Sequence, residues 1–507
     1  MRFKPLLASL PLVLALSVAG CGDDSRDDDQ ARPGAAGAGD SLYPGLGNGG
    51  YQVEHYTLDI AVADVERGEL TGLATLEAVA TQRLSRFNLD LIGMTVDAVR
   101  VDGQLASFSR DGRELIVTPA AALAEGAPFT VEVSYRGTPE RYMSLALPEP
   151  VGWTLHAGGS YVLSQPDGAA TFYPVNDHPR DKASYTFRVT VPKPYQVAAN
   201  GVLSETADNG DSTTYVFEAR DQMASYLATI AIERFEVVTE TGPNELPLRS
   251  YFPEGIDPGY RVPFANQAKI IELLNDRFGP FPFEIYGSVM VSSSDLPGAL
   301  ETQTLSLFGN DSFYLELPSY GELVVVHETA HQWYGDSVAV TDWRDVWINE
   351  GFATYAEWLW LEETQGVAAR DEQIAETYAF VAAFPTAAPP GRPASDDLFN
   401  YISTYARPGL MLHALRLEIG DDAFFALSRT YATRYAHGNA SRDHLFALVE
   451  EVSARKLDAF FDAWLYDQIV PPIPQMNLSA ATAKASRPLL RDDDARIHRH
   501  GRWTTPR

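Results

Sequence analysis

The sequence predicts a multidomain α+β protein in which an N-terminal antiparallel β-sheet domain is followed by a mainly α-helical domain. Short alternating or β-branched segments, separated by turns that contain glycine, fill the first half of the chain. Beyond Tyr260 the apolar residues recur at three- and four-residue spacing, which is typical of helices packed on one face. With 507 residues, of which 45% are hydrophobic, the chain has enough apolar material for more than one core.

The β-rich domain is expected at residues 50–240. Its predicted strands are 54–62, 70–80, 114–117, 129–135, 184–191 and 214–218. The turn-forming pairs between the segments are Asp102-Gly103, Asp111-Gly112, Asn200-Gly201 and Asn209-Gly210. Such pairs are typical of hairpins, and hairpins join antiparallel strands.

The helical domain is expected at residues 241–475. Its predicted helices are 262–278, 320–334, 349–363, 370–384, 408–419 and 421–435. Two short apolar segments near the start of this domain, 288–293 and 305–308, are predicted to be edge strands of a small sheet.

Both ends of the chain lack the apolar residues that folding needs. Residues 21–49 are rich in Asp, Gly, Ala and Pro, which predicts a flexible tether. Residues 476–507 are polar and mix both charges, which predicts a disordered tail.

The first 20 residues have the pattern of an export signal. A short basic start precedes an apolar stretch over residues 6–18, and this stretch is too short to span a bilayer comfortably. Residues 18–21, Val-Ala-Gly-Cys, resemble the bacterial lipoprotein signal. The resemblance implies cleavage before Cys21, lipid on its thiol, and attachment of the exported protein to the outer face of a membrane. Because Cys21 is the only cysteine, an intramolecular disulfide is impossible.

The charge balance excludes one class of partner. The formal net charge is −29, from 39 Lys and Arg against 68 Asp and Glu. Such a surface repels phosphate backbones and anionic headgroups. We therefore expect no nucleic acid partner, and contact with a membrane through the lipid anchor only.

A metal-binding motif lies on the predicted helix 320–334. It reads His327-Glu328-Thr329-Ala330-His331. A step of four residues returns to nearly the same helix face, so both imidazoles can reach one ion. Glu328 lies beside the ion, where it can accept a proton from a bound water. The motif predicts a zinc site.

The third expected ligand is Glu350, nineteen residues after His331 (350 minus 331) and at the start of the next predicted helix. A loop over residues 335–344 lets that helix run back and place Glu350 opposite the histidines. Two imidazoles and one carboxylate leave the fourth position for water, which is typical of a catalytic zinc rather than a structural one. We expect one zinc ion, because no second carboxylate cluster suggests a two-metal site.

At this point the sequence resembles the gluzincin aminopeptidases of the aminopeptidase N type, which include leukotriene hydrolase. Their signature is His-Glu-x-x-His, eighteen residues and then Glu, and Asn349-Glu350-Gly351 also resembles the family. The resemblance implies a thermolysin-like zinc catalytic domain at residues 241–475. Few residues follow the helix expected to end near Tyr466, so the chain resembles a short form without the large C-terminal helical domain of other members.

A second family element is a Gly-x-Met-Glu-Asn type segment, whose Glu binds the free amino group of the substrate. Here it reads Gly298-Ala299-Leu300-Glu301-Thr302. The resemblance implies that Glu301 pairs with the substrate ammonium and that Gly298 and Ala299 contact the substrate. Thr302 in place of Asn departs from the family pattern.

The resemblance assigns two further residues. Tyr405, in a segment similar to the family's Tyr-x-Lys-Gly, is implied to donate a hydrogen bond to the oxyanion, although Arg407 and Pro408 depart from the pattern and Tyr401 competes for the role. Gln165 is implied to line the pocket for the first side chain.

The function that the resemblance implies is hydrolysis of the N-terminal residue from peptides with a free N-terminus, with Glu328 as general base. One alternative is a zinc endopeptidase or a bifunctional epoxide hydrolase. Another is a non-catalytic, peptide-binding surface lipoprotein. An ammonium-binding carboxylate favours the exopeptidase, and retention of Glu328 and all three ligands favours an enzyme.

Overall fold

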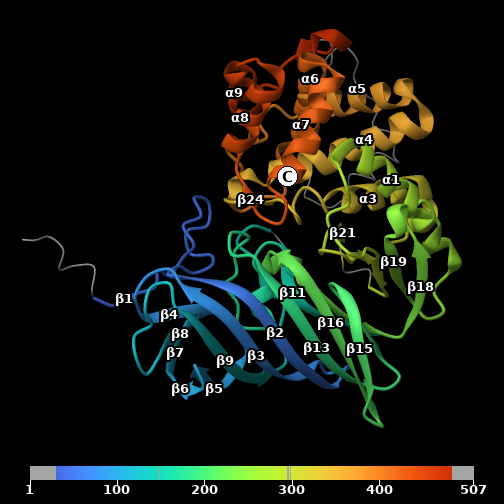
Figure 1. The fold of residues 1–507 in the computed structure, drawn as a ribbon. Helices are drawn as coiled ribbons and strands as arrows, with labels where there is room; N and C mark the ends of the chain where they lie inside the picture. The colour runs from blue at the N-terminus through green and yellow to red at the C-terminus, as the bar shows by residue number, and fades with distance from the viewer. Residues whose placement is uncertain (1–29, 148, 294–295, 297, 482–507) are drawn as a thin grey trace, which may run out of the picture.

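A computed structural model describes residues 30–147, 149–293, 296 and 298–481 of the chain. The expected export signal, Cys21, residues 22–29 of the expected tether and residues 482–507 of the expected tail lie outside the described residues. The order predicted from the sequence, a β-sheet domain followed by a mainly helical one, is confirmed, with the β domain below and the helices above in Figure 1.

Three sheets make up the β domain. Its strands are β1 (Arg32–Pro33), β2 (Tyr51–Asp64), β3 (Glu69–Ala80), β4 (Leu84–Asp90), β5 (Thr95–Val101), β6 (Gln104–Leu105), β7 (Ser107–Asp111), β8 (Glu114–Thr118), β9 (Pro128–Gly137), β10 (Tyr142–Met143), β11 (Pro150–His156), β12 (Gly159–Leu163), β13 (Ala183–Pro192), β14 (Gln196–Ala199), β15 (Val202–Asp208), β16 (Ser212–Met223) and β17 (Ile230–Glu233). The largest sheet has eight strands in the order β15-β16-β13-β2-β3-β9-β5-β6.

The pairing in the eight-stranded sheet is antiparallel except between β2 and β13, which are parallel. Along β13 buried and half-buried residues alternate without a break, because successive side chains point to opposite faces of a strand. The buried side chains of β2, β3, β9 and β13 form the core under the smaller sheets. A smaller cluster, which includes Tyr161, Ala198 and Ala231, packs the β domain against strands of the second domain.

The second domain begins with a five-stranded sheet in the order β18-β19-β20-β22-β21. Its strands are β18 (Phe235–Thr241), β19 (Pro247–Pro253), β20 (Ser288–Val291), β21 (Ala299–Leu300) and β22 (Ser306–Gly309). Because β18 pairs with β19 along its whole length, the domain boundary lies before Phe235 and the expected boundary at residue 240 is wrong. The expectation that 288–293 and 305–308 form edge strands is also wrong, since β20 and β22 are inner strands and are buried on both faces.

Nine α-helices are described after this sheet begins. They are α1 (Gln267–Phe278), α2 (Phe313–Glu316), α3 (Pro318–Ala330), α4 (Trp347–Gln365), α5 (Val367–Ala383), α6 (Arg407–Ile419), α7 (Asp421–Arg434), α8 (Arg442–Ser453) and α9 (Asp458–Tyr466). The predicted helix 262–278 is divided into a 3-10 helix, η5 (Pro258–Phe264), and α1, because Pro263 has no N–H for an α-helical bond.

Helix α4 is the central helix of the second domain. It packs against α3, α5 and α6, and its residues are buried from Trp347 almost continuously to Leu361. Gly366 ends it with a φ of 90°, a conformation that glycine adopts without steric cost. A helix buried in this way holds its side chains in a fixed position, and its first turn carries Glu350.

The described part of the expected tether is folded. In residues 30–49 the side chains of Asp40, Tyr43 and Leu46 are buried, and β1 pairs with β4. The prediction of a flexible tether up to residue 49 is therefore wrong for this part. At the other end, the first residues of the expected tail are also placed, since Ile473 pairs with Leu478 in an isolated bridge.

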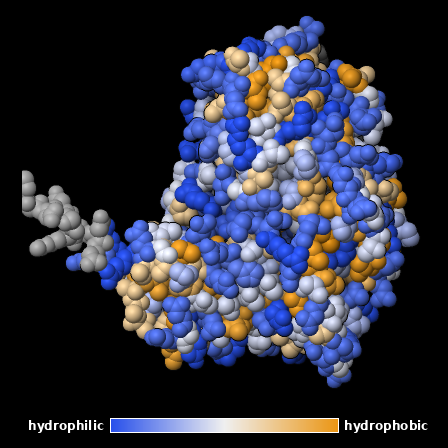
Figure 2. All heavy atoms as spheres, viewed as in Figure 1, coloured by the Kyte–Doolittle hydropathy of each residue, from blue (hydrophilic) through white to orange (hydrophobic). Residues whose placement is uncertain are grey.

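The surface agrees with the charge balance of the sequence. Figure 2 shows polar residues over most of the visible face, with apolar residues scattered among them. In the part of the chain that the structure describes, no helix combines the length and the apolar character needed to cross a membrane.

Candidate active site

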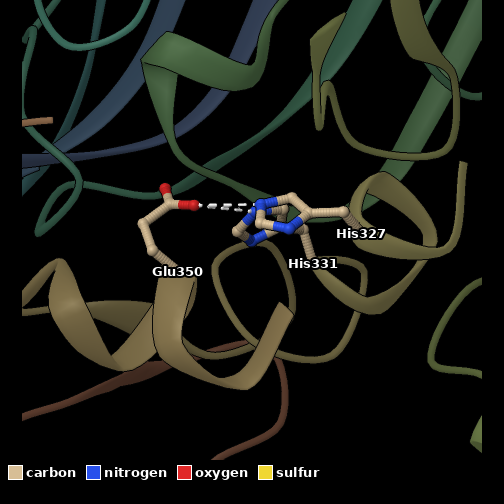
Figure 3. A group of neighbouring side chains, drawn as sticks. All are labelled: His327, His331 and Glu350. Carbon is tan, nitrogen blue, oxygen red and sulfur yellow. Dashed lines mark hydrogen bonds and ion pairs between the residues drawn. The ribbon is translucent and has the colours of Figure 1, made fainter. Parts of the chain in front are cut away.

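Two helices bring the three expected metal ligands together. Helix α3 carries His327 and ends just before His331, while Glu350 lies in the first turn of α4 and faces both imidazoles (Figure 3). Oε2 of Glu350 lies 3.2 Å from Nε2 of His327 and 3.2 Å from Nε2 of His331. The ligand atoms of the three residues lie within 4.8 Å of one another.

The other nitrogen of each imidazole has its own partner. Nδ1 of His327 lies 2.7 Å from Oε1 of Glu357, and Nδ1 of His331 lies 2.9 Å from the carbonyl oxygen of Tyr334. These acceptors place a proton on Nδ1 and leave Nε2 with a free lone pair, which is the arrangement that a metal-ligating histidine needs. The partners therefore orient both rings toward Glu350.

This donor set fits zinc. Two imidazole nitrogens and one carboxylate oxygen are the ligands of catalytic zinc sites, which keep one position open. Although burial lowers it, the pKa of His331 is raised to about 9 by the nearby carboxylates of Glu350 and Glu301. The same surroundings favour any cation between the imidazoles, and a bound metal would displace their extra protons. His327, His331 and Glu350 would hold the ion.

Two further carboxylates adjoin these ligands. Ligand atoms of Glu301, Glu328 and His331 also lie within 4.8 Å of one another. Only Glu350 contacts Nε2 of both histidines, so His327, His331 and Glu350 form the better cage for one ion. Burial raises the pKa of Glu328 to about 8 and also raises that of Glu301, and a bound cation would lower both.

Glu301 is held by residues from both domains. Its Oε1 accepts a hydrogen bond of 2.8 Å from Nε2 of Gln165, and its backbone carbonyl accepts one of 3.2 Å from Nε2 of Gln332. Burial and then the nearby charge of Glu301 raise the pKa of the Tyr226 phenol, so this ring also adjoins the Glu301 side chain. The structure thus places Gln165 of the β domain within the site.

Gly298 and Ala299 lead into Glu301 along the edge of the small sheet. Strand β21 pairs with β22 on one side only and is the last strand of its sheet. The outer backbone groups of an edge strand can pair with an added extended chain. Gly298 has a φ of 79°, and a Cβ atom there would have no neighbour within 4 Å, so open space adjoins this turn.

The two candidate tyrosines lie at different positions in η7 (Tyr401–Ala406), a single π-helical turn. The ring centroid of Tyr405 lies 5.9 Å from that of His327, at an interplanar angle of 26°. Tyr401 packs against Tyr405 and Phe380. Burial and then the charges of Glu350, Glu301 and Glu328 raise the pKa of Tyr405, which keeps its hydroxyl protonated as a donor. The geometry favours Tyr405 over Tyr401 for a role at the metal centre.

Two residues of the site were not predicted from the sequence. Glu357 lies seven residues after Glu350 (357 minus 350), two turns along the same face of α4, so the helical period could have indicated it. Tyr226 comes from a short 3-10 helix of the β domain, η3 (Ser225–Leu227). The local sequence around Tyr226 contains no pattern that indicates a contact with Glu301.

Comparison with known proteins gives matches over both domains. A model described as the peptidase family M1 domain matches residues 262–464, and one described as the peptidase M1 N-terminal domain matches residues 52–227. An M1 zinc metallopeptidase from Deinococcus radiodurans has a similar solved structure, with a TM-score of 0.79 and 34% identity over 86% of this chain and 99% of that one. A mutant of that protein has been solved with the peptide Tyr-Ser-Ala bound.

Curated relatives are longer than this chain. Aminopeptidase N of Streptomyces lividans is 25% identical over 82% of this chain and 50% of its own length. Probable aminopeptidase 2 of Sulfurisphaera tokodaii is 24% identical over 74% of this chain and 49% of its own length. The chain thus spans about half the length of these curated relatives.

Proposed function

The chain belongs to peptidase family M1, and from this premise we propose that it is a zinc-dependent aminopeptidase, which hydrolyses the N-terminal residue from peptides. The two domains of this chain match a two-domain M1 zinc metallopeptidase over 86% of this chain and 99% of that one. The ligand set His327, His331 and Glu350 supports zinc as the cofactor.

The position of Glu301 carries the exopeptidase proposal. An exopeptidase needs a carboxylate at a fixed distance from the metal to pair with the substrate ammonium, and a charge-assisted pair of this kind is short and directional. Glu301 lies beside Glu328 and His331, and Gln165 restrains its side chain. A peptide whose ammonium pairs with Glu301 would present its first peptide bond to the metal centre.

The proposed mechanism divides the steps among four side chains. A bound zinc ion would supply a Lewis acid that acidifies water and polarises a carbonyl. Glu328 would accept a proton from the attacking water and later deliver it to the leaving amine. Tyr405 would donate a hydrogen bond from its hydroxyl group to the oxygen of the scissile carbonyl as negative charge develops there. Glu301 and Gln165 would hold the N-terminal residue in place.

Hydrolysis of aminoacyl amides beside their N-acetylated forms tests the proposal. The purified protein should cleave substrates with a free amine far faster than their acetylated forms, and a chelator should abolish cleavage until zinc is restored. Glu328→Gln should retain zinc and lose about 10²- to 10⁴-fold in kcat, the usual contribution of a general base. Equal cleavage of acetylated substrates would instead support an endopeptidase and would contradict the role of Glu301.

The other functions are less well supported. A bifunctional epoxide hydrolase would share the zinc site, so cleavage of an epoxide substrate is the measurement that would reveal it. A peptide-binding protein without catalysis would not need Glu328 and a complete ligand set, all of which are present. Zinc binding without cleavage of any peptide would favour that function.

For localisation, we propose that the enzyme is an exported bacterial lipoprotein anchored through Cys21. The basic start, the apolar stretch and the small residues before Cys21 support this. In a bacterial host, the wild-type protein should remain with the membrane fraction after a salt wash, because a salt wash releases charge-bound proteins only. Cys21→Ser should release the exported protein into the soluble fraction. A wild-type protein that is soluble would contradict lipid attachment.

A further inference from the structure

Residues 38–48, which we call the clasp, form a segment that ties the two domains together. The clasp precedes residue 52, the first residue matched by the M1 N-terminal domain model. At its end it is fixed to the β domain, since the backbone N–H of Asn48 donates to Oδ1 of Asn176 at 2.6 Å and Nδ2 of Asn176 donates to the carbonyl of Asn48 at 3.0 Å. The side chain of Leu46 is buried in the β-domain core.

Asp40 is the best-connected residue of the clasp. Its Oδ1 accepts hydrogen bonds from the backbone N–H groups of Leu42 at 2.8 Å and Tyr43 at 2.7 Å. Its Oδ2 lies 2.7 Å from the backbone nitrogen of Trp343, in the second domain, and 3.1 Å from Nε2 of His178, in the β domain. Nδ1 of His178 accepts a hydrogen bond from the backbone N–H of Arg180, so Nε2 is the donor to Asp40. One buried carboxylate therefore joins three segments of the chain.

Two other residues of the clasp also form hydrogen bonds with the second domain. The backbone N–H and the hydroxyl of Ser41 both donate to the carboxylate of Asp342 at 2.9 Å. The hydroxyl of Tyr43 donates to the carbonyl of Ser395 at 2.7 Å, across 352 residues of sequence. Ser395 lies on the segment that leads into η7, which carries Tyr405.

The turn that Asp40 holds leads directly to a metal ligand. Trp343 begins η6 (Trp343–Asp345), α4 follows at Trp347, and the backbone N–H of Glu350 donates to the carbonyl of Val346 at 3.2 Å. No flexible loop separates Trp343 from Glu350. A displacement of the Trp343 backbone would therefore pass into the first turn of α4.

The ring of Trp343 connects the same turn to the substrate side of the site. It packs on Tyr226 with a centroid distance of 5.2 Å, and Tyr226 lies close enough to Glu301 for the charge of that carboxylate to raise the pKa of its phenol. Tyr43, Trp343 and Tyr405 belong to one buried cluster that crosses the domain junction. The clasp thus contacts elements that carry or support three functional groups, Glu350, Glu301 and Tyr405.

We propose that Asp40 is a positioning residue for the reaction, because its carboxylate fixes the Trp343 turn, and through it Glu350 and Glu301, relative to the β domain that supplies Gln165. Catalytic groups from two domains must be held to within a fraction of an ångström, and small displacements from remote changes lower the rate strongly. A buried carboxylate with four donors is a rigid connector of this kind.

Asp40→Asn in the full chain tests the proposal. Asparagine has one carbonyl oxygen, so it cannot accept from both donor pairs, and the bonds to Trp343 and His178 are weakened while the shape of the side chain is kept. We expect kcat to fall by about tenfold to a hundredfold with KM changed by less than about twofold. We also expect the variant to release zinc to a chelator about tenfold faster than the wild type does.

Val133→Ala is the matched control for stability. Val133 lies on β9 in the β-domain core. Its replacement by Ala should lower Tm without changing kcat or the rate of zinc release. His178→Asn is the second test variant, since it keeps an acceptor for the backbone N–H of Arg180, removes the Nε2 donor to Asp40 and should lower kcat by about threefold. If Asp40→Asn does not fold, His178→Asn decides the result.

The outcomes are distinct. A fall in kcat supports the proposal, with faster zinc release placing the effect at Glu350 and unchanged zinc release placing it at Glu301 and Tyr405. A folded Asp40→Asn variant with wild-type kcat and wild-type zinc release would overturn it, as would wild-type kcat and zinc release in His178→Asn if that variant has to decide. The kcat measurement rests on the proposed aminopeptidase activity, whereas zinc release does not. If the wild type cleaves no peptide, the proposed function fails, and zinc release alone decides the role of Asp40.

Discussion

Nε2 of Gln165 donates a hydrogen bond of 2.8 Å to Oε1 of Glu301, which joins two buried side chains from different domains, 136 residues apart in the sequence. An amide donor at this position restrains the carboxylate without adding a positive charge that would compete with a substrate ammonium. The pocket that we propose for the N-terminal residue would therefore be built by both domains together.

Replacing Gln165 with Ala should weaken substrate binding. The change leaves Oε1 of Glu301 without its donor, and a hydrogen bond to a charged group contributes about 1.5 to 3 kcal/mol. We expect kcat/KM for free-amine substrates to fall by about tenfold or more, chiefly through KM. Steady-state kinetics on aminoacyl amides measure the change in kcat/KM. Gln165→Glu should be worse still because it adds a like charge, and equal kinetics for all three proteins would contradict this role.

Replacing Glu357 with Gln should weaken zinc binding. The carboxylate holds Nδ1 of His327 at 2.7 Å, and loss of such a partner typically costs about 10- to 100-fold in metal affinity. Competition with a chromogenic chelator measures the affinity. Glu363→Gln is the control, because that residue lies on the same helix but is exposed. Equal affinities in the two variants would show that Glu357 does not orient the ligand.

His413 should make the stability of the protein depend on pH in the acid range. Burial and the charges of Arg370 and Arg416 lower its pKa from 6.5 to about 4. In the unfolded chain the imidazole binds a proton below about pH 6.5, whereas in the folded protein it does so only below about pH 4. The unfolded state therefore takes up more protons between these values, and stability falls as the pH falls through this range.

The full effect is about 3 kcal/mol, at 1.36 kcal/mol for each of the about 2.5 pH units between 6.5 and 4. His413→Asn retains an acceptor for the hydroxyl of Tyr355 and removes the titration. Chemical denaturation at pH 8 and pH 4.5 should show a smaller loss of stability in the variant than in the wild type. Parallel losses in both proteins would mean that other groups cause the pH dependence.

The metal ligands were predictable because their spacing reflects local geometry. His327 and His331 are one helical turn apart, and Glu350 lies in the first turn of the next long helix. The positions of these residues in the sequence were therefore enough to predict that their side chains lie together. The contact between Gln165 and Glu301 has no such local cause. It depends on how two separately folded sheets meet, and only the family resemblance placed both residues at the substrate.

The predictions that were wrong also have physical explanations. The average composition of residues 21–49 indicated a tether, but Asp40 and Asn48 make buried hydrogen bonds that an average cannot register. The strands β20 and β22 were expected at a sheet edge. They pair with each other in parallel, β22 also pairs antiparallel with β21, and both are buried along their whole length. A mostly apolar run such as that of β20 is typical of an inner strand.

Tyr405 and Tyr401 should differ sharply on loss of their hydroxyl groups. Tyr405 stacks near His327, and an oxyanion donor contributes about 2.7 to 4 kcal/mol to lowering the barrier. Tyr405→Phe should therefore lower kcat by about 10²- to 10³-fold with little change in KM. Tyr401→Phe keeps the packing against Phe380 and should stay within about threefold of wild type. The reverse order of effects would assign the donor role to Tyr401.

Glu301→Gln should convert the enzyme into a poor catalyst that no longer selects for a free amine. Gln keeps the shape of the side chain but replaces a charge-assisted pair with the substrate ammonium by a neutral hydrogen bond of about half the strength. Binding energy from that pair also orients the first peptide bond, so its loss lowers kcat as well as raising KM. We expect kcat/KM for a free aminoacyl amide to fall by about 10²-fold, while the slow cleavage of its acetylated form changes by less than about threefold. The ratio of the two rates isolates the ammonium contribution from any general damage to the metal site, because damage there lowers both rates together. An unchanged ratio would therefore remove Glu301 from substrate selection, even if the variant were less active.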